Sequence, residues 1–381
     1  MNPSITDLVT TELRACYDTY GIVAGTHHYS DYWTRDAYFA WLSALEIGDP
    51  SIVKTHLSFL SKFQKNSGLI PFMVRQNIPG LPFFGIKKHI KPFPKYRSHK
   101  ALYTSNVIDS NAYYVMGFYD YFNKTKDIEF VEANLRNITI ALNWYKRRQN
   151  KSLLVHEGLI AQWNDGIYKS GYVLVTNIQV YYAHYTYALL LQLLNKDSTE
   201  AFTFAQEIKE QIIKNYWENS YFIDWLNRGK RYTYFDTIGN LLAIIWEITN
   251  ESMQNSILDF AKANVYDVPL AKVCFPNYPS GRVELTNKVF GVGGYWQGKD
   301  VYWIEPSLLY CLAMHKAGRV EEAKTVLNEI SILISKDFGV FETYKLEKQN
   351  FVPLKSRFYV SEHPYARGAG LYLHVCKTLK I

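Results

Sequence analysis

The sequence lacks several features that mark other classes of protein. Its 381 residues include 4 cysteines, too far apart for a CxxC motif or the mixed Cys/His spacing of a metal site. No uncharged apolar run reaches the roughly 18 residues of a membrane span. The first residues show no basic segment followed by an apolar one, as a signal peptide would. We therefore expect free buried thiols, no metal or cofactor, no membrane partner and a cytoplasmic location.

Nothing in the sequence resembles an interdomain linker or a nucleic-acid-binding stripe. No Pro/Gly/Ser-rich, charged or low-complexity stretch marks a boundary, so we expect one domain over residues 1–381. The net charge is +7, but Lys and Arg are scattered, whereas nucleic-acid binders concentrate them. The densest basic cluster, over 87–100, lies among prolines and aromatics and is typical of a solvated loop. We expect no nucleic-acid partner, with contact to an acidic ligand as the alternative.

Aromatic residues are what the sequence has in excess, with 31 tyrosines and 9 tryptophans. Tyr and Trp present a flat apolar face with a polar tip, and the C–H faces of sugar rings pack well on such surfaces. Large helical cores also use aromatics. The excess therefore raises the expectation of a sugar-binding protein without requiring one.

The apolar periodicity predicts twelve helices joined by alternating short and long connections. The segment 236–249 is apolar on nearly every side and should be buried all round, whereas 319–335 has one apolar face. Six buried helices alternating with six amphipathic ones predict an all-α fold, an (α/α)6 toroid of two concentric rings. An open helical solenoid is the alternative, which the lack of capping repeats disfavours. The predicted spans are 5–18, 34–48, 50–65, 106–123, 127–149, 175–194, 197–216, 236–249, 251–263, 300–317, 319–335 and 364–379.

The predicted toroid places the short connections at one end and the long ones at the other, where each leads into an inner helix. Long loops on a rigid scaffold are where binding and catalytic sites are built. We therefore expect the catalytic and binding residues in the long connections, which are 19–33, 66–105, 150–174, 217–235, 264–299 and 336–363.

The first long connection ends in Trp33-Thr34-Arg35-Asp36, where an inner helix is predicted to begin. Arg35 offers a fork of donors and Asp36 a carboxylate, which together suit adjacent sugar hydroxyls. Trp33 can supply a platform for the ring. The alternative is an ordinary helix start, with Thr34 as its cap and Asp36 in its first turn.

Two later connections carry candidate catalytic carboxyl groups. Trp163-Asn164-Asp165 lies in one of them, and the desolvation expected beside a Trp favours the protonated form that a general acid needs. The same residues also make a good turn. The last long connection holds Glu342 and Glu362, both candidates for the second carboxyl that glycoside hydrolysis requires.

These segments resemble motifs of glucoamylases and of the glucosidase domain of glycogen debranching enzymes, which are six-hairpin (α/α)6 glycoside hydrolases. Segment 33–36 resembles their Trp-x-Arg-Asp motif, whose Arg and Asp hold hydroxyls of the terminal glucose. Segment 163–165 resembles the debranching-type Trp-x-Asp, whose Asp is the general acid. Glucoamylases have a Glu directly after that Trp, where this chain has Asn164.

Two C-terminal segments extend the resemblance. Segment 341–344 resembles the Glu-x-Tyr or Glu-x-Phe segment whose Glu is the general base, and 365–371 resembles the final inner helix, without its usual Trp. Segment 294–303 resembles the aromatic stretch that enters the preceding inner helix. We interpret Glu362 as a residue beside the start of the last helix, with the base assignment between it and Glu342 left open. Together these similarities imply a substrate site made of Trp33, Arg35, Asp36, Trp163, Asn164, Trp296, Gln297, Trp303, Glu362 and Arg367.

The resemblance implies an inverting glycoside hydrolase that releases terminal glucose from α-linked gluco-oligosaccharides, with Asp165 as general acid and Glu342 as general base. Trehalases, neutral invertases and mannosylglycerate hydrolases share the toroid and remain alternatives. A phosphorylase is a further alternative, in which groups that bind phosphate would replace the base. A non-catalytic sugar-binding protein is another, and it would need neither carboxyl group. No starch-binding or β-sandwich domain is evident, so we expect a short oligosaccharide or glycoside as substrate, bound by a monomer or homodimer.

Overall fold

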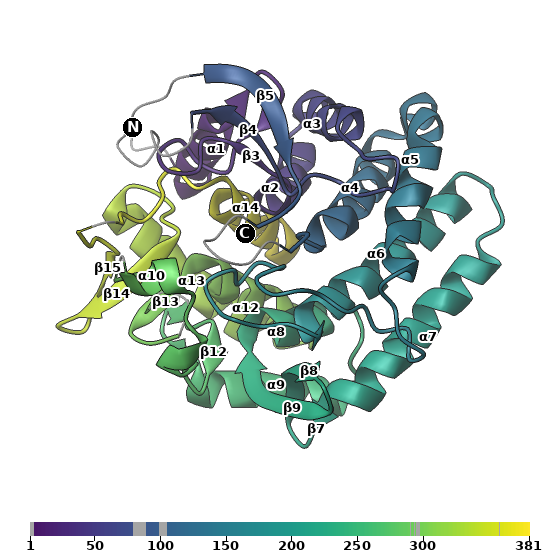
Figure 1. Cartoon of the computed structure of the whole chain (residues 1–381). Helices are drawn as coiled ribbons and strands as arrows, with labels where there is room; N and C mark the ends of the chain where they lie inside the picture. Colours follow the sequence, from purple (N-terminus) through teal and green to yellow (C-terminus); the bar gives the residue numbers. More distant parts are fainter. Residues whose placement is uncertain are drawn as a thin grey trace.

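Six buried helices form a closed inner ring in the computed structural model, which describes residues 4–78, 89–98, 105–289, 291–292, 294, 298–357 and 359–381. Each helix packs on the next, α2 on α4, α4 on α6, α6 on α8, α8 on α12 and α12 on α14, and α14 packs back on α2 (Figure 1). The ring helices are α2 (Thr34–Glu46), α4 (Asp109–Thr125), α6 (Leu174–Leu193), α8 (Thr237–Ile245), α12 (Ile304–Lys316) and α14 (Ala366–Leu379).

Six further helices pack on the outside of this ring, each against an inner helix next to it in sequence or, for α1, against the last one. They are α1 (Ile5–Ala15), α3 (Pro50–Lys62), α5 (Ile128–Lys146), α7 (Thr199–Tyr216), α9 (Glu251–Asn264) and α13 (Val320–Asp337). All twelve helices predicted from the sequence are therefore present, and the predicted (α/α)6 toroid is confirmed.

Burial of the side chains explains which helices lie inside. Every residue of α8 except the last is buried, so no face of this helix is left for solvent. In α13 the buried residues are Ala323, Leu327, Ile330, Leu333 and Ile334, which form one stripe at helical spacing. Ring closure needs close approach of the first and last inner helices, and Gly370 of α14 allows it, because a Cβ atom there would lie 2.7 Å from Ala40 Cα.

The short connection between α2 and α3 has Asp49 and Pro50 at the start of α3. Proline suits the first helical position, and Asp49 stands where a capping residue is preferred, but it makes no side-chain capping hydrogen bond. Its carboxylate instead accepts from Arg14 Nε at 2.9 Å and from the Tyr17 hydroxyl at 3.1 Å. An ion pair to the neighbouring outer helix has replaced the cap.

Short antiparallel strands occupy the long connections, and the sequence did not predict them. A hairpin joins β1 (Tyr17–Asp18) to β2 (Gly21–Ile22), and a three-stranded sheet has the order β3 (Tyr32–Trp33), β4 (Met73–Asn77), β5 (His89–Lys95). A second sheet has the order β12 (Cys274–Phe275), β9 (Lys230–Asp236), β8 (Tyr221–Asn227), β6 (Tyr172–Val173), with β7 (Trp217–Glu218) also on β8. A third runs β10 (Tyr266–Asp267), β11 (Leu270–Ala271), β13 (Val301–Trp303), β14 (Thr343–Glu347), β15 (Asn350–Pro353).

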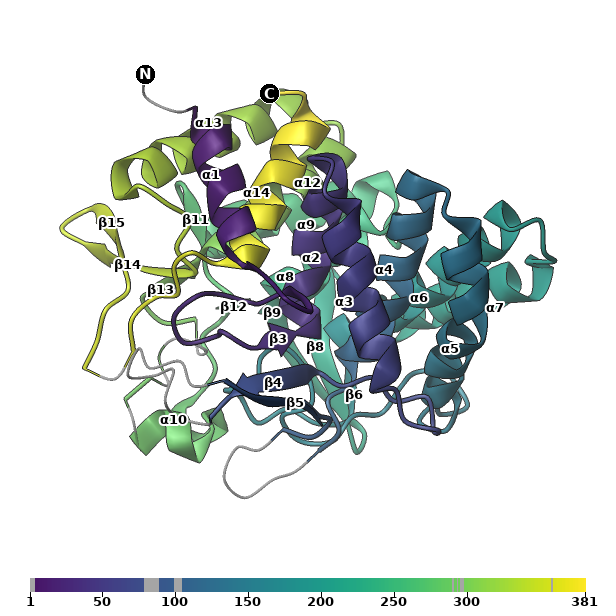
Figure 2. The same ribbon diagram turned by 90° about the horizontal axis from the view of Figure 1, so that it is seen from above.

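These sheets tie successive long connections to one another, because most strands pair with strands from a different connection. Figure 2 shows β3, β4, β5 and β6 below the inner helices, while α13 and the C-terminus lie at the opposite end. The short helix α10 (Leu285–Val289) lies at the same lower end. The loops that lead into the inner helices are thereby held as a connected layer over one end of the ring.

Two further expectations concern the cysteines and membrane-spanning helices. The four cysteines, Cys16, Cys274, Cys311 and Cys376, form no disulfide and are buried, as predicted. Within the part of the chain that the structure describes, no helix combines the length and apolarity needed to cross a membrane.

Candidate active site

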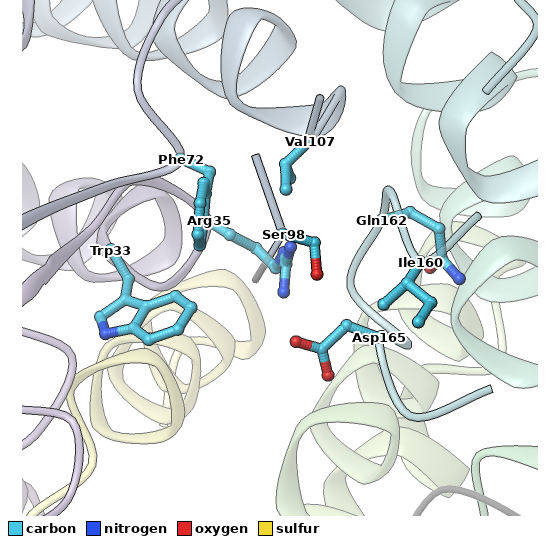
Figure 3. A pocket seen from close by; sticks show the side chains of 8 residues that line it. All are labelled: Trp33, Arg35, Phe72, Ser98, Val107, Ile160, Gln162 and Asp165. Atoms are coloured by element: carbon cyan, nitrogen blue, oxygen red, sulfur yellow. The ribbon is translucent and has the colours of Figure 1, made fainter. Parts of the chain in front are cut away.

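A cavity of about 90 Å³ lies where the start of α2 meets the connection that precedes α6. Figure 3 shows Asp165 pointing into it from one side and Trp33 and Arg35 reaching it from the other. The sequence-predicted residues Trp33, Arg35 and Asp165 thus share one cavity. Within the part of the chain that the structure describes, its lining residues are Trp33, Arg35, Phe72, Ser98, Val107, Ile160, Gln162 and Asp165.

Trp33 is held by a strand and not by a simple helix cap. It pairs in register with Met73 of β4, and its ring lies 5.6 Å from that of Phe72 and 6.0 Å from that of Tyr29, between centroids. The side chain of Thr34 does not cap α2 but donates to the carbonyl of Pro71 at 2.7 Å. Thr34 is therefore not the cap that the alternative required, whereas Asp36 does lie in the first turn of α2.

Arg35 forms an ion pair with the adjacent inner helix α4 and not with Asp36, its neighbour in the motif. Its Nε donates to Asp109 Oδ2 at 2.5 Å, and its Nη1 donates to the carbonyl of Trp163 at 3.4 Å. Asp109 is the first residue of α4 and is 1% exposed. Arg35 therefore connects the starts of two inner helices to the loop that carries Asp165.

Asp36 and Arg367 lie in a second charged group at the start of α14. Arg367 donates to Glu305 of α12, and Asp36 Oδ1 accepts from the Tyr365 hydroxyl at 3.3 Å. Burial raises the pKa of Asp36, while the charges of Arg367 and Arg35 act to lower it. Burial also raises the pKa of Glu305 to about 7, against the lowering effect of Arg367. Arg367 itself is buried and ion-paired beneath the site.

The loop that carries Asp165 is fixed by main-chain contacts on both sides. The carbonyl of Ala161 accepts from Ile108 N at 2.9 Å, and the carbonyl of Gly166 accepts from Glu284 N at 2.8 Å. Asn164 N donates to the side chain of Gln162 at 2.8 Å. The Asn164 side chain is buried, and neither of its polar atoms bonds to any residue that the structure describes.

Glu342 comes immediately before β14, whose first residue Thr343 pairs with Trp303. Its side chain is 6% exposed, and its Oε2 accepts a hydrogen bond from the Tyr359 hydroxyl. Burial is the largest cause that raises the pKa of Glu342 to about 8, and the Tyr359 hydrogen bond opposes it. Three nearby negative charges add to the increase, those of Glu362, Asp36 and Glu305.

Glu362 has a different position from Glu342, although the two residues are joined by a main-chain hydrogen bond of 3.2 Å. Its two carboxylate oxygens accept the backbone N–H groups of His27 and His28 at 2.6 and 2.7 Å. It thereby closes the turn that precedes Tyr29. These contacts fit the interpretation of Glu362 as a residue beside the start of the last helix.

Tyr29 lies in the negative electrostatic field of the candidate carboxylates, and the sequence did not single it out. Burial and then four negative charges raise the pKa of Tyr29 well above its ordinary value. The four charges are those of Glu342, Glu362, Asp165 and Asp36. The charges of Asp165 and Glu342 therefore both contribute to the raised pKa of Tyr29. The only local signal for Tyr29 is its place four residues before Trp33.

Trp163 and Trp303, both predicted to contact substrate, are 4% exposed and pack edge to face with centroids 6.3 Å apart. Trp303 also precedes α12, so this pair ties two long connections together. Trp296 and Gln297, the remaining predicted substrate residues, lie outside the described residues.

One cluster among the described residues has the composition of a metal site. Side-chain ligand atoms of His27, His28 and Glu362 lie within 4.8 Å of one another. Because Glu362 already accepts a backbone N–H group on each oxygen, the closed turn explains the cluster without an ion.

No family model and no curated protein matches this sequence. Solved structures do match in fold. The GH63 mannosylglycerate hydrolase of Thermus thermophilus, in complex with glucose, has a TM-score of 0.71 at 13% identity, over 97% of this chain and 99% of that one. A glycosidase in complex with glucose gives 0.67 at 11% identity, over 99% and 97%. A rhamnosidase from Klebsiella oxytoca with bound rhamnose gives 0.69 at 10% identity, over 99% of this chain and 64% of that one. The chain therefore shares the six-hairpin (α/α)6 fold of these glycoside hydrolases.

Proposed function

We propose that the protein is an inverting glycoside hydrolase in which Asp165 is the general acid and Glu342 the general base. The observation that supports this most strongly is that Asp165 shares a cavity with Trp33 and Arg35, while Glu342 is buried in the connection before the last inner helix. Asp165 comes from the connection before α6 and Glu342 from the one before α14, and these helices are three positions apart in the ring of six. Their loops therefore start from opposite sides of the ring.

The reaction assigned to these groups breaks the bond between the anomeric carbon and the glycosidic oxygen. Asp165 gives its proton to the departing oxygen, and Glu342 takes a proton from the water that attacks the anomeric carbon on the other face. Inverting enzymes hold the two carboxyl groups roughly 6.5–9.5 Å apart to leave room for that water. Water adds across the bond, and the two proton transfers balance.

Arg35, Asp36 and Trp33 would hold the sugar ring. The Arg35 guanidinium is fixed by Asp109, so it can be oriented before substrate arrives. Asp36 is half-buried. Hydrogen bonds from sugar hydroxyls would favour its charged form. Terminal glucose in an α-linkage is the sugar that the Trp-x-Arg-Asp resemblance favours.

A substrate panel with and without phosphate tests the proposal. Maltose, malto-oligosaccharides, trehalose, sucrose, mannosylglycerate and rhamnosides would each be incubated with the enzyme, and the products separated by thin-layer chromatography. Free glucose from an α-glucoside, independent of phosphate, is the expected result. A sugar phosphate formed only when phosphate is present would identify a phosphorylase instead, and no cleavage of any member would contradict hydrolysis.

A further inference from the structure

The Lys and Arg residues are scattered along the chain, but one segment has no acidic residue to balance them. Residues 51–108 contain ten Lys or Arg residues and no Asp or Glu. The whole chain has 42 basic and 35 acidic residues, so the rest of it has 32 basic residues against 35 acidic ones. The net positive charge of the protein is therefore carried by this segment alone. Charge of one sign gathered in one place attracts ligands of the opposite sign.

This segment forms the outer helix α3 and the strands β4 and β5. Two of its basic residues are neutralised by other parts of the chain, because Lys54 Nζ lies 2.6 Å from Asp127 Oδ2 and Arg75 Nε lies 3.5 Å from Asp31 Oδ2. Four lysines of the segment form no ion pair with any residue that the structure describes, and these are Lys62, Lys65, Lys91 and Lys95. Their charges are available to an external anion.

Basic and aromatic side chains lie together along β5. Lys91, Phe93 and Lys95 are two residues apart and so project from one face of the strand, and the Lys95 ammonium lies 4.9 Å from the centre of the Phe93 ring. Lys65 follows α3, and its ammonium lies 4.0 Å from the centre of the half-buried Tyr96 ring. We call Lys65, Lys91 and Lys95 the basic strip. Lysines beside aromatic faces suit a chain of sugar rings that carries anionic groups.

The end of β5 is continuous with the wall of the cavity in Figure 3. The carbonyl of Tyr96 accepts from Val107 N at 3.0 Å, and Ser98 N donates to the carbonyl of Ser105 at 2.9 Å. Ser98 and Val107 both line the cavity. Figure 1 shows β5 running inward from the edge of the molecule. A long ligand that lies on the basic strip is thereby directed toward the cavity.

This continuity distinguishes between two kinds of anionic polymer. Phosphates of a nucleic acid would also pair with Lys, and its bases would also stack on aromatic rings. The cavity beside the strip, however, holds the residues assigned to a sugar ring, Trp33 and Arg35, so a glycan fits both places. Asp165 also lines the cavity, and its negative charge favours a neutral sugar there. The anionic groups of the ligand would then lie on the strip.

We propose that the basic strip binds an acidic polysaccharide, a sugar chain with carboxylate or sulfate groups, whose neutral terminal sugar enters the cavity. The proposal rests on the proposed function, which assigns the cavity to the terminal sugar of the substrate. It specifies a substrate that is longer than the short oligosaccharide expected from the sequence and that is charged outside its terminal residue.

Binding of labelled polymers to the wild-type protein tests the proposal. Fluorescein-labelled dextran sulfate and neutral dextran of the same length would each be titrated with protein and followed by fluorescence anisotropy. Dextran sulfate should bind, and its Kd should rise about tenfold between 50 and 200 mM NaCl, because salt screens the charges and competes for them. Neutral dextran should bind far more weakly. Equal affinity for the two polymers would overturn the proposal.

Substitution of the three lysines assigns the binding to the basic strip. Lys65→Gln, Lys91→Gln and Lys95→Gln combined should raise the Kd for dextran sulfate about tenfold, since each exposed ion pair contributes a modest amount. Arginine at the same three positions keeps the charge and should keep the affinity. An unchanged Kd in the glutamine variant would contradict the proposal.

A matched control removes three charges at the opposite end of the ring. Lys124, Lys377 and Lys380 are exposed lysines at the ends of α4 and α14, and their combined change to Gln should leave the Kd nearly unaltered. Equal losses in the two glutamine variants would show that only net charge matters and would overturn the assignment to the strip.

Two further measurements separate the alternatives. Single-stranded DNA with the same number of charges should bind more weakly than dextran sulfate, and tighter binding of DNA would assign the strip to a nucleic acid instead. Dextran sulfate should inhibit cleavage of 4-nitrophenyl α-glucoside, and less so in the glutamine variant of the strip. Binding without inhibition would contradict the continuity with the cavity. Selective binding without cleavage of any glycoside would retain the strip and contradict the hydrolase, whereas cleavage without selective binding would do the reverse.

Discussion

Tyr359 donates its phenolic hydrogen to Oε2 of Glu342. The bond reaches a carboxyl whose pKa is raised to about 8, mainly by burial and also by its negative neighbours. Tyr359 is the group that favours the charged form of Glu342 in this setting, since a donated hydrogen bond stabilises a carboxylate. This hydrogen bond therefore helps to set the pH range in which the proposed base is ionised and can accept a proton.

Replacing Tyr359 with Phe should move the acid side of the pH–activity profile. A general base works when ionised, so kcat/KM should rise with pH through about 8, the pKa of Glu342. Loss of a hydrogen bond to a charged group should raise that pKa by about one unit, so the acid limb of the kcat/KM profile should move to higher pH. Tyr372→Phe, which removes a hydroxyl bonded to Ser331 on the neighbouring outer helix, should leave the profile unchanged. An unaltered limb in Tyr359→Phe would exclude this role.

Replacing Asp165 with Asn should affect substrates according to their leaving group. Alkyl glycosides and disaccharides need protonation of a poor leaving group, and their kcat should fall by about 10²–10⁴-fold. Aryl glycosides with acidic phenols need little protonation and should keep much of their activity. Stopped assays on butyl and 4-nitrophenyl glucosides measure both. Equal losses for the two substrates would contradict the assignment of Asp165 as the acid.

The Glu342→Gln variant should lose activity, whereas the Glu362→Gln variant should mainly lose stability. Glu342→Gln removes the base and should abolish turnover of natural and activated substrates, with partial recovery in azide. Glu362→Gln keeps one oxygen for the backbone N–H of His27 or His28 but loses the other acceptor. It should lower the melting temperature while retaining measurable activity. An inactive Glu362→Gln beside an active Glu342→Gln would reverse the base assignment.

The buried pair of Lys169 and Asp224 should be important for stability. Their side chains are fully buried, with Nζ 2.7 Å from Asp224 Oδ2, and Tyr278 also donates to this carboxylate. Lys169→Met leaves Asp224 buried without its cation and should lower the free energy of unfolding by about 3–5 kcal/mol. Urea unfolding measures the loss, and adding Asp224→Asn to the variant should recover part of it. A loss below about 1 kcal/mol would show that the pair contributes little.

The helices could be predicted from sequence because the signal for each of them is local. Apolar residues at helical spacing distinguish α13 from the all-apolar α8, and Gly48 and Pro50 mark the boundary between α2 and α3. The strands could not be predicted, because many have two or three residues and pair with distant partners. Trp303 pairs with Thr343 forty residues later, and nothing near either residue specifies that contact.

Part of the candidate site could be predicted from the sequence, because the signal for those residues is also local. Asp165 and Glu342 stand out because each lies in a long connection within a short segment that resembles a family motif. Asp109 and Glu305 were missed, although an acidic residue in the first turn of a buried helix was an available signal. Tyr359 could not be found from the sequence, because its role depends on folding of the last connection beside Glu342.

The anomeric form of the first product tests the central claim most directly. We would follow cleavage of an α-glucoside by proton NMR during the first minutes, before mutarotation mixes the anomers. Asp165 as acid and Glu342 as base on opposite sides of the bond predict release of β-glucose. Release of α-glucose would require a retaining mechanism, with carboxyl groups only about 5–5.5 Å apart, and would contradict the assigned roles.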